Sequence, residues 1–241
     1  MTGTGASRRA VSLEVALSAD PDAGGGSGDG DGREAGSAGP GREPAPEEPP
    51  AGARSGPGDR SAADAWLPDE AFVARWARCA VDAALADAEP ADARLAGDGP
   101  LAVELSAHLA GAGESRALNR EHRGRDAPTN VLSFPSGLPA LPMSGDGPDG
   151  GADDPAHGAP TLVALGDLVL CPEVIRREAA EQDKEARAHW AHLVVHGTLH
   201  LLGLDHEDAA GAARMEAVEV RLLSAGGWPD PYRATPDEAA R

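Results

Sequence analysis

The spacing of apolar residues along the chain predicts a series of short strands and amphipathic helices. Apolar and polar residues alternate over residues 11–18, which is the period-2 pattern of a strand buried on one face. Further strands are predicted over residues 101–105, 130–134 and 161–170. Apolar residues at helical spacing predict helices over residues 68–87, 114–119, 172–181, 185–202 and 208–225. This order predicts an α+β fold, in which a small mixed β-sheet packs against helices.

The last two predicted helices differ in how they are expected to pack. The helix over residues 185–202 carries apolar residues on all sides, as expected of a helix in the middle of a domain. The helix over residues 208–225 is amphipathic instead. Its predicted buried stripe consists of Met215, Val218 and Leu222.

Two stretches of low complexity interrupt the apolar pattern. Residues 19–64 contain no aromatic residue and no Leu, Ile, Val or Met. Such a segment cannot bury enough apolar surface to offset its ordering entropy, so it is predicted to be disordered. Residues 139–160 are similar and are predicted to form a flexible insertion. One domain is expected, with its first strand in residues 1–18, its remainder in residues 65–235 and a tail at 236–241.

Three histidines near the end of the helix over residues 185–202 have the spacing of a metal site. His196, His200 and His206 stand at positions i, i+4 and i+10, with Gly203 at i+7. Residues four apart on a helix project from the same face, and a glycine can end the helix and turn the chain back. His206 is therefore expected to meet the other two. Three neutral imidazoles leave one position open on a tetrahedral zinc ion, which is typical of a catalytic site.

Gly197 occupies the position at which zinc peptidases of the His-Glu-x-x-His type carry a glutamate. That glutamate is the general base of the peptidase reaction, so a peptidase built on this frame would lack its base in the usual place. A metal ion held by the three histidines could still polarise a water molecule or a phosphoryl oxygen. The ligand set therefore predicts a hydrolytic metal site and argues against ordinary peptide hydrolysis.

Four further segments accompany the histidine motif, in a fixed order along the chain. They are residues 123–135, 165–169, 189–195 and 227–232. In this combination, which covers most of residues 66–232, the chain resembles the YbeY family of bacterial endoribonucleases and rRNA maturation factors. The resemblance implies a first strand followed closely by a helix, which makes residues 19–64 an insertion between the two. It also implies a zincin-like arrangement around a central metal-binding helix.

Arg123 is the candidate catalytic residue beyond the metal ligands. The resemblance implies that it acts near one zinc ion held by His196, His200 and His206, which are the other candidate catalytic residues. An arginine fork binds phosphate through two hydrogen bonds and stays charged at any working pH. The alternative is a loop arginine that pairs with Asp126.

Several polar residues near these motifs have two possible roles. Each of them either supports the metal site or the substrate, or serves packing, a turn or a strand end. They are His189, His192, Asp205, Asp167, Thr129, Asn130 and Ser133.

A formal net charge of −19 limits how the chain can bind RNA, because affinity for phosphate comes mainly from Lys and Arg. Residues 1–65, with six basic and eleven acidic residues, contribute only −5 of this charge. RNA contact is therefore expected to be local, near the arginine cluster at residues 116–125. Weak non-specific binding would suit an enzyme that a protein partner docks on its target.

The resemblance, together with the metal motif, implies a zinc-dependent, single-strand-specific endoribonuclease. The resemblance implies a role in 3′-end maturation of small-subunit rRNA and in ribosome quality control, with ribosomal RNA, the small subunit and its proteins or assembly factors as partners. Two cysteines in no paired spacing, the lack of an 18-residue apolar run and the lack of a secretory signal predict a cytoplasmic protein without a membrane span. Neither membrane nor DNA is expected as a partner. A metallopeptidase-like hydrolase and a non-catalytic ribosome-assembly factor with a structural metal are the alternatives.

Overall fold

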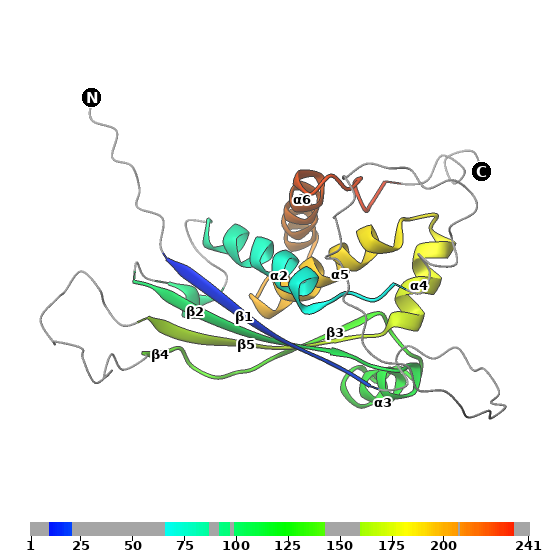
Figure 1. Cartoon of the computed structure of the whole chain (residues 1–241), viewed down its shortest axis with the longest axis horizontal. Helices are drawn as coiled ribbons and strands as arrows, with labels where there is room; N and C mark the ends of the chain where they lie inside the picture. The colour runs from blue at the N-terminus through cyan, green and yellow to red at the C-terminus, as the bar shows by residue number, and fades with distance from the viewer. Residues whose placement is uncertain are drawn as a thin grey trace, which may run out of the picture.

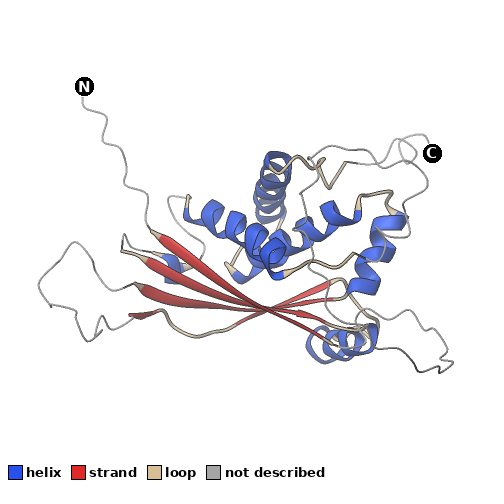
Figure 2. Cartoon of the chain, viewed as in Figure 1, coloured by secondary structure: helices blue, strands red, loops and turns tan. Residues whose placement is uncertain are grey.

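Five strands in the described part of the chain form one mixed sheet, which a group of helices covers (Figures 1 and 2). The computed structural model describes residues 10–20, 66–86, 92–96, 99–142, 160–206 and 208–233. The strands are β1 (Val11–Ala19), β2 (Leu101–Leu109), β3 (Val131–Pro135), β4 (Leu141–Pro142) and β5 (Thr161–Leu170). The helices are α2 (Glu70–Leu85), a 3₁₀ turn η1 (Ala93–Leu95), α3 (Ala112–Arg123), α4 (Pro172–Glu181), α5 (Ala186–Leu201) and α6 (Ala209–Ala225). The predicted α+β class is confirmed.

The strands lie in the order β1-β2-β5-β3, and all but the last pairing on this path are parallel. β3 and β4 both run antiparallel to β5, β3 beside its end and β4 beside its beginning. They form one interrupted edge of the sheet. The sequence predicted a flexible insertion from residue 139 onward, whereas Leu141–Pro142 still pair with β5. Three of the predicted segments lie mainly or wholly outside the described residues. They are the insertion (143–159), the disordered stretch (21–64) and the tail at 236–241.

Helix α5 lies at the centre of the molecule, where it contacts the sheet at β3 and β5 and packs against α2, α4 and α6 (Figure 1). It has apolar residues on all sides, and Trp190, Val194 and Leu199 have no exposed surface. Removing such side chains from water is the main favourable term in folding. Helix α3 lies on the other face of the sheet, where Leu118 packs against Leu132. No helix in the described ranges is long and apolar enough to cross a membrane.

Two helices differ from the sequence prediction. Helix α3 continues to Arg123, because it contains little to stop it before Gly124, which takes a left-handed conformation (φ 69°). The buried stripe of α6 is also rotated from the predicted one. Met215 is buried as predicted, but the other buried residues are Glu219 and Leu223, while Val218 and Leu222 are half-buried.

Candidate metal centre and cleft

The three histidines of the motif come together at the end of α5. Their ring centroids lie 4.7 Å (His196 to His200), 4.9 Å (His200 to His206) and 5.8 Å (His196 to His206) apart. One nitrogen atom from each ring lies within 4.8 Å of the others, so the group could hold a metal ion. Three imidazole nitrogen donors on a partly open side of the protein fit a zinc ion that keeps one position for a water or a substrate.

The end of α5 explains how His206 reaches the other two rings. Gly203 takes a left-handed conformation (φ 82°), and the amide of Leu204 donates a hydrogen bond to the carbonyl of Leu199. The bond closes a turn of six residues, 199–204. This is the bond of a Schellman cap. The Leu204 side chain is then buried against the core, which fixes the direction in which the chain leaves the helix. His206 follows two residues later.

The surroundings of His200 keep its imidazole neutral. Burial, together with the neighbouring His196 and His206 rings, lowers the pKa of His200 to about 4. A histidine binds a metal only through an unprotonated nitrogen, so this ring is competent as a ligand over the neutral pH range.

A cleft of about 510 Å³ adjoins the three imidazoles. Arg123 and Arg125 line one part of it, and Asn130 and Ser133 line another. Asp205 is the one carboxylate among the lining residues of this cleft in the described part of the chain, and its Oδ1 accepts a hydrogen bond from the His206 amide. That bond is typical of a turn. The cleft therefore places two guanidinium groups near the candidate metal ligands.

Arg123 makes no ion pair with Asp126, which was the alternative drawn from the sequence. Asp126 instead accepts two hydrogen bonds from Arg116, at 2.8 and 2.7 Å, and lies 3.9 Å from Arg120. The hydrogen bond from Arg116 holds the pKa of Asp126 below its usual range. Two of the four arginines in the predicted basic cluster are thus engaged with a carboxylate, and Arg123 stands exposed at the end of α3.

The loop between α3 and β3 is held in place by buried polar side chains. The Ser115 hydroxyl donates to the carbonyl of Thr129 and accepts from its amide, and the Asn119 amide group donates to the carbonyl of Ala127. Asn130 donates to Glu178 of α4 at 2.9 Å, and its own side-chain oxygen accepts from the Val131 amide. The cleft wall is therefore fastened to two helices.

Gly197 lies where α5 packs closely against the sheet. A Cβ atom at this position would lie 2.8 Å from the Leu168 side chain and 3.2 Å from those of Ser133 and Val131. The Ser133 hydroxyl donates to the Gly197 carbonyl at 3.1 Å, which ties β3 to the helix. Leu168 is fully buried and has little room to move. The glutamate of a peptidase would not fit at this position without a shift of these side chains of the sheet.

Glu219 is the residue that the sequence reasoning missed. It lies on α6 without exposed surface, and it accepts hydrogen bonds from His196 Nδ1 (2.8 Å), His192 Nε2 (3.2 Å) and the Tyr232 hydroxyl. Burial alone would raise the pKa of Glu219, but the hydrogen bonds from His192 and His196 lower it to about 2. An acidic residue at four-residue spacing from Met215 and Leu223, on the buried stripe, was the available signal.

The remaining histidines of α5 do not join the three-imidazole group. His192 bonds Glu219, as described, and His189 is buried with its Nε2 3.0 Å from Glu178. Both therefore support neighbouring carboxylates.

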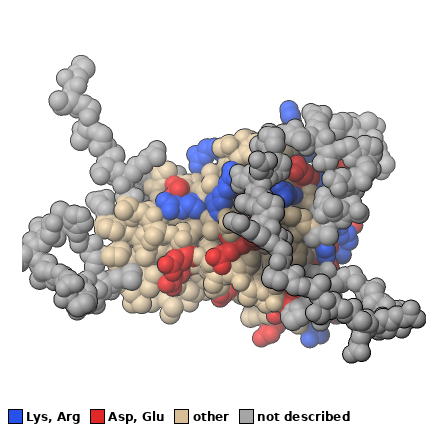
Figure 3. Space-filling model, viewed as in Figure 1, with Lys and Arg blue, Asp and Glu red and all other residues tan. Residues whose placement is uncertain are grey.

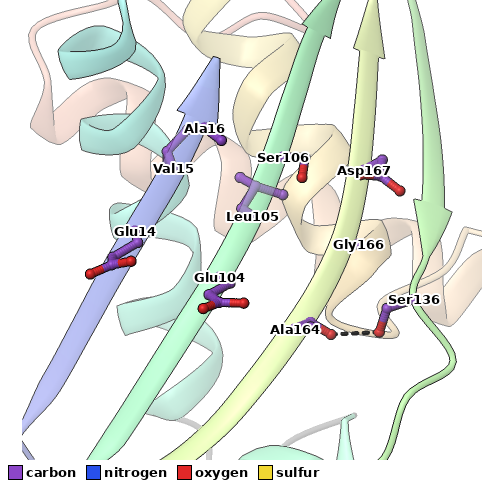
Figure 4. Close-up of a pocket in the computed structure, with 10 residues that line it drawn as sticks. All are labelled: Glu14, Val15, Ala16, Glu104, Leu105, Ser106, Ser136, Ala164, Gly166 and Asp167. Carbon is purple, nitrogen blue, oxygen red and sulfur yellow. Dashed lines mark hydrogen bonds between the residues drawn. The ribbon is translucent and has the colours of Figure 1, made fainter. Parts of the chain in front are cut away.

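Asp167 lies on the face of the sheet that turns away from α5. It lines a different hollow together with Glu14 and Glu104 (Figure 4). Asp167 projects from β5, Glu14 from β1 and Glu104 from β2. The idea that Asp167 faces the metal cleft is therefore wrong, because Leu168, its neighbour, is the residue that points to α5. In the view of Figure 3, basic side chains gather near the middle of the described surface, and acidic side chains lie mostly below them.

The sequence of this chain is similar to proteins of one known family. A family model described as "Endoribonuclease YbeY" matches residues 69–227. A protein of that name from Halorhodospira halophila is 54% identical over 130 residues, which are 54% of this chain and 75% of that protein. Another, from Alkalilimnicola ehrlichii, is 47% identical over 169 residues, 70% and 84% of the two chains. A Thermotoga maritima protein solved in solution aligns with a TM-score of 0.36 and 19% identity, over 69% of this chain and 95% of that one.

Proposed function

Because this chain belongs to the YbeY family of endoribonucleases, we propose that it cleaves single-stranded RNA with the help of one zinc ion and of Arg123. The ion would be held by His196, His200 and His206. The observation that carries the proposal is that these imidazoles and Arg123 line the same cleft.

The residues of the cleft divide the work of phosphodiester cleavage between them. Zinc supplies a Lewis acid that polarises a phosphoryl oxygen or a water molecule. Arg123 binds the scissile phosphate through its guanidinium and stabilises the charge that builds on its oxygens. The Asn130 side chain is already engaged with Glu178 and Val131, so it shapes the wall and leaves the binding of phosphate to the arginines. Gly197 offers no base.

The proposed target is ribosomal RNA, in maturation of the 3′ end of the small-subunit rRNA and in ribosome quality control, in the cytoplasm. The formal charge of −19 supports a role for a protein partner, such as a small-subunit protein or an assembly factor. A polyanion binds weakly to an acidic protein unless a local basic site or a third component brings them together.

Neither alternative accounts for the cleft as well. A metallopeptidase would need a base at the place of Gly197, where even a Cβ atom meets Leu168. A non-catalytic assembly factor with a structural metal would be expected to close the fourth metal position with a protein ligand. Among the described residues, the three-imidazole group has no fourth ligand of this kind.

Cleavage of a ribosomal RNA fragment by purified protein tests the proposal, with the bound metal measured for every variant. His200→Ala should lose metal and activity together. Arg123→Ala should keep its metal and lose about 10²–10³-fold in kcat/KM, the usual loss when a donor to a developing charge is removed. Arg221→Ala, an exposed arginine of α6 outside the cleft, serves as the matched control and should behave as wild type. Equal cleavage by all four preparations would mean a contaminating nuclease and would leave the assembly-factor alternative standing.

A further inference from the structure

Glu219 is a buried carboxylate whose three hydrogen-bond donors belong to different parts of the molecule. His196 and His192 lie on α5, and Tyr232 lies in the turn after α6. Burial of an ionised carboxylate is costly unless hydrogen bonds and opposite charge compensate for it. Two imidazoles and one phenol hydroxyl donate these bonds, and none of the three is a permanently charged group such as a guanidinium.

The bond from His196 bears directly on the candidate metal centre. Its Nδ1 lies 2.8 Å from Glu219 Oε1 and must carry the proton of that bond. In the neutral ring this leaves Nε2 unprotonated, with a lone pair that can be given to a metal ion. A carboxylate that accepts from the far nitrogen of a ligating imidazole fixes its tautomer and orientation and raises its basicity.

We propose that Glu219 is a positioning residue, which holds His196 in the Nδ1–H tautomer for metal binding and supplies the negative charge that the ion balances. The inference deepens the proposed function and rests on its assignment of His196 as a metal ligand. Glu219 itself does not touch the ion or the RNA. Its second oxygen binds His192 and Tyr232, which keeps the carboxylate from rotating away from His196.

The same contacts allow one competing arrangement. His192, His196 and Glu219 each offer a ligand atom within 4.8 Å of the others, so this inner group could hold an ion itself. Such an ion would replace the protons of both imidazole bonds. It would also require His196 to bind metal through Nδ1, whereas the positioning role requires Nε2. The two arrangements therefore differ in metal stoichiometry and in the nitrogen that is protonated.

The first test uses the wild-type protein without metal. Nitrogen-15 chemical shifts of the His196 ring at neutral pH report which nitrogen carries the proton. The Nδ1–H tautomer is expected, and an Nε2–H tautomer would overturn the proposal without any variant.

The second test is the zinc affinity of Glu219→Gln, measured by competition with a chromogenic chelator. Loss of the carboxylate should weaken zinc binding by about 10- to 100-fold, as is usual for a residue that supports a metal ligand. Glu216→Gln removes the same charge from an exposed position one turn earlier on α6 and should bind zinc as wild type does. Unchanged affinity in Glu219→Gln would refute the positioning role. Two ions per wild-type chain, one of them lost in Glu219→Gln, would establish the inner metal site instead.

These readouts use no RNA, so the two proposals can fail separately. A wild-type protein that binds zinc as described but cleaves no RNA would refute the proposed function and leave the role of Glu219 intact. Cleavage that depends on His200 and Arg123, with zinc affinity indifferent to Glu219, would do the reverse.

Discussion

Substitution of Gly197 by alanine tests how closely α5 lies on the sheet. Alanine is favoured over glycine inside a helix by about 1 kcal/mol, so an open helical site would gain stability. At Gly197 the added methyl would lie 2.8 Å from Leu168, which is buried among core residues, and 3.2 Å from Ser133 and Val131. Forcing an extra carbon into a packed core costs about 1–3 kcal/mol. The variant is therefore expected to be neutral or up to about 2 kcal/mol less stable.

Gly113→Ala provides the matched control for this experiment. Gly113 lies in α3, it is exposed, and an added Cβ would meet no atom within 4 Å. This variant should gain about 0.5–1 kcal/mol. Urea unfolding of the metal-free proteins gives the difference between the two variants, which isolates the packing cost at about 1–3 kcal/mol. If Gly197→Ala were stabilised as much as Gly113→Ala, the close approach of helix and sheet would be refuted, and with it the steric argument against a peptidase.

Other features of the structure give further expected outcomes. Gly166→Ala should destabilise the fold by about 3 kcal/mol or more, because φ is +133° and a Cβ would collide with the Phe134 carbonyl. Urea unfolding measures this loss, and a midpoint equal to that of the wild type would contradict it. The pKa of His200 is about 4 in the folded protein, against an ordinary value of 6.5, so the unfolded chain binds more protons between these two pH values. The free energy of unfolding should therefore rise with pH over this window. His200→Gln should flatten that rise in urea midpoints measured from pH 4 to 7. Removal of zinc by a chelator, starting from free zinc at about 100 times its Kd, should lower stability by about 2.7 kcal/mol and the melting temperature by roughly 5–10 °C, a shift that should be absent in His200→Ala.

The sequence predicted elements with a clear apolar period closely. β5 (Thr161–Leu170) and α4 (Pro172–Glu181) lie at their predicted bounds, and Pro172 occupies the first turn of the helix, where proline is tolerated. α3 was predicted too short, because few of its residues are apolar and the pattern gives little signal. Gly124 ends α3, so Arg123 is the last residue of the helix, whereas the sequence placed it in the loop that follows.

Side-chain partners across the fold were harder to predict than local structure. The spacing of His196, His200 and His206 implies their meeting, because a helix and its cap determine it locally. Glu219 reaches His196 only through the packing of α6 on α5, a contact between residues 23 apart in sequence. The sequence prediction assigned the buried stripe of α6 to Val218 and Leu222, one position before the residues that are buried. With that assignment, Glu219 was expected to face solvent. Tertiary packing, which has no short-range signature, decides such cases.

The acidic hollow on the outer face of the sheet has a consequence for how the molecule meets a polyanion. Glu14, Glu104 and Asp167 face away from α5, while Arg123 and Arg125 stand beside the imidazoles. A polyanion that approaches this hollow therefore meets three carboxylates, whereas one that approaches the cleft meets two guanidinium groups. These local charges orient an encounter toward the cleft rather than toward the hollow, even though the net charge of −19 slows approach. Added salt shortens the reach of these charges, so it weakens the overall repulsion and the orienting effect together.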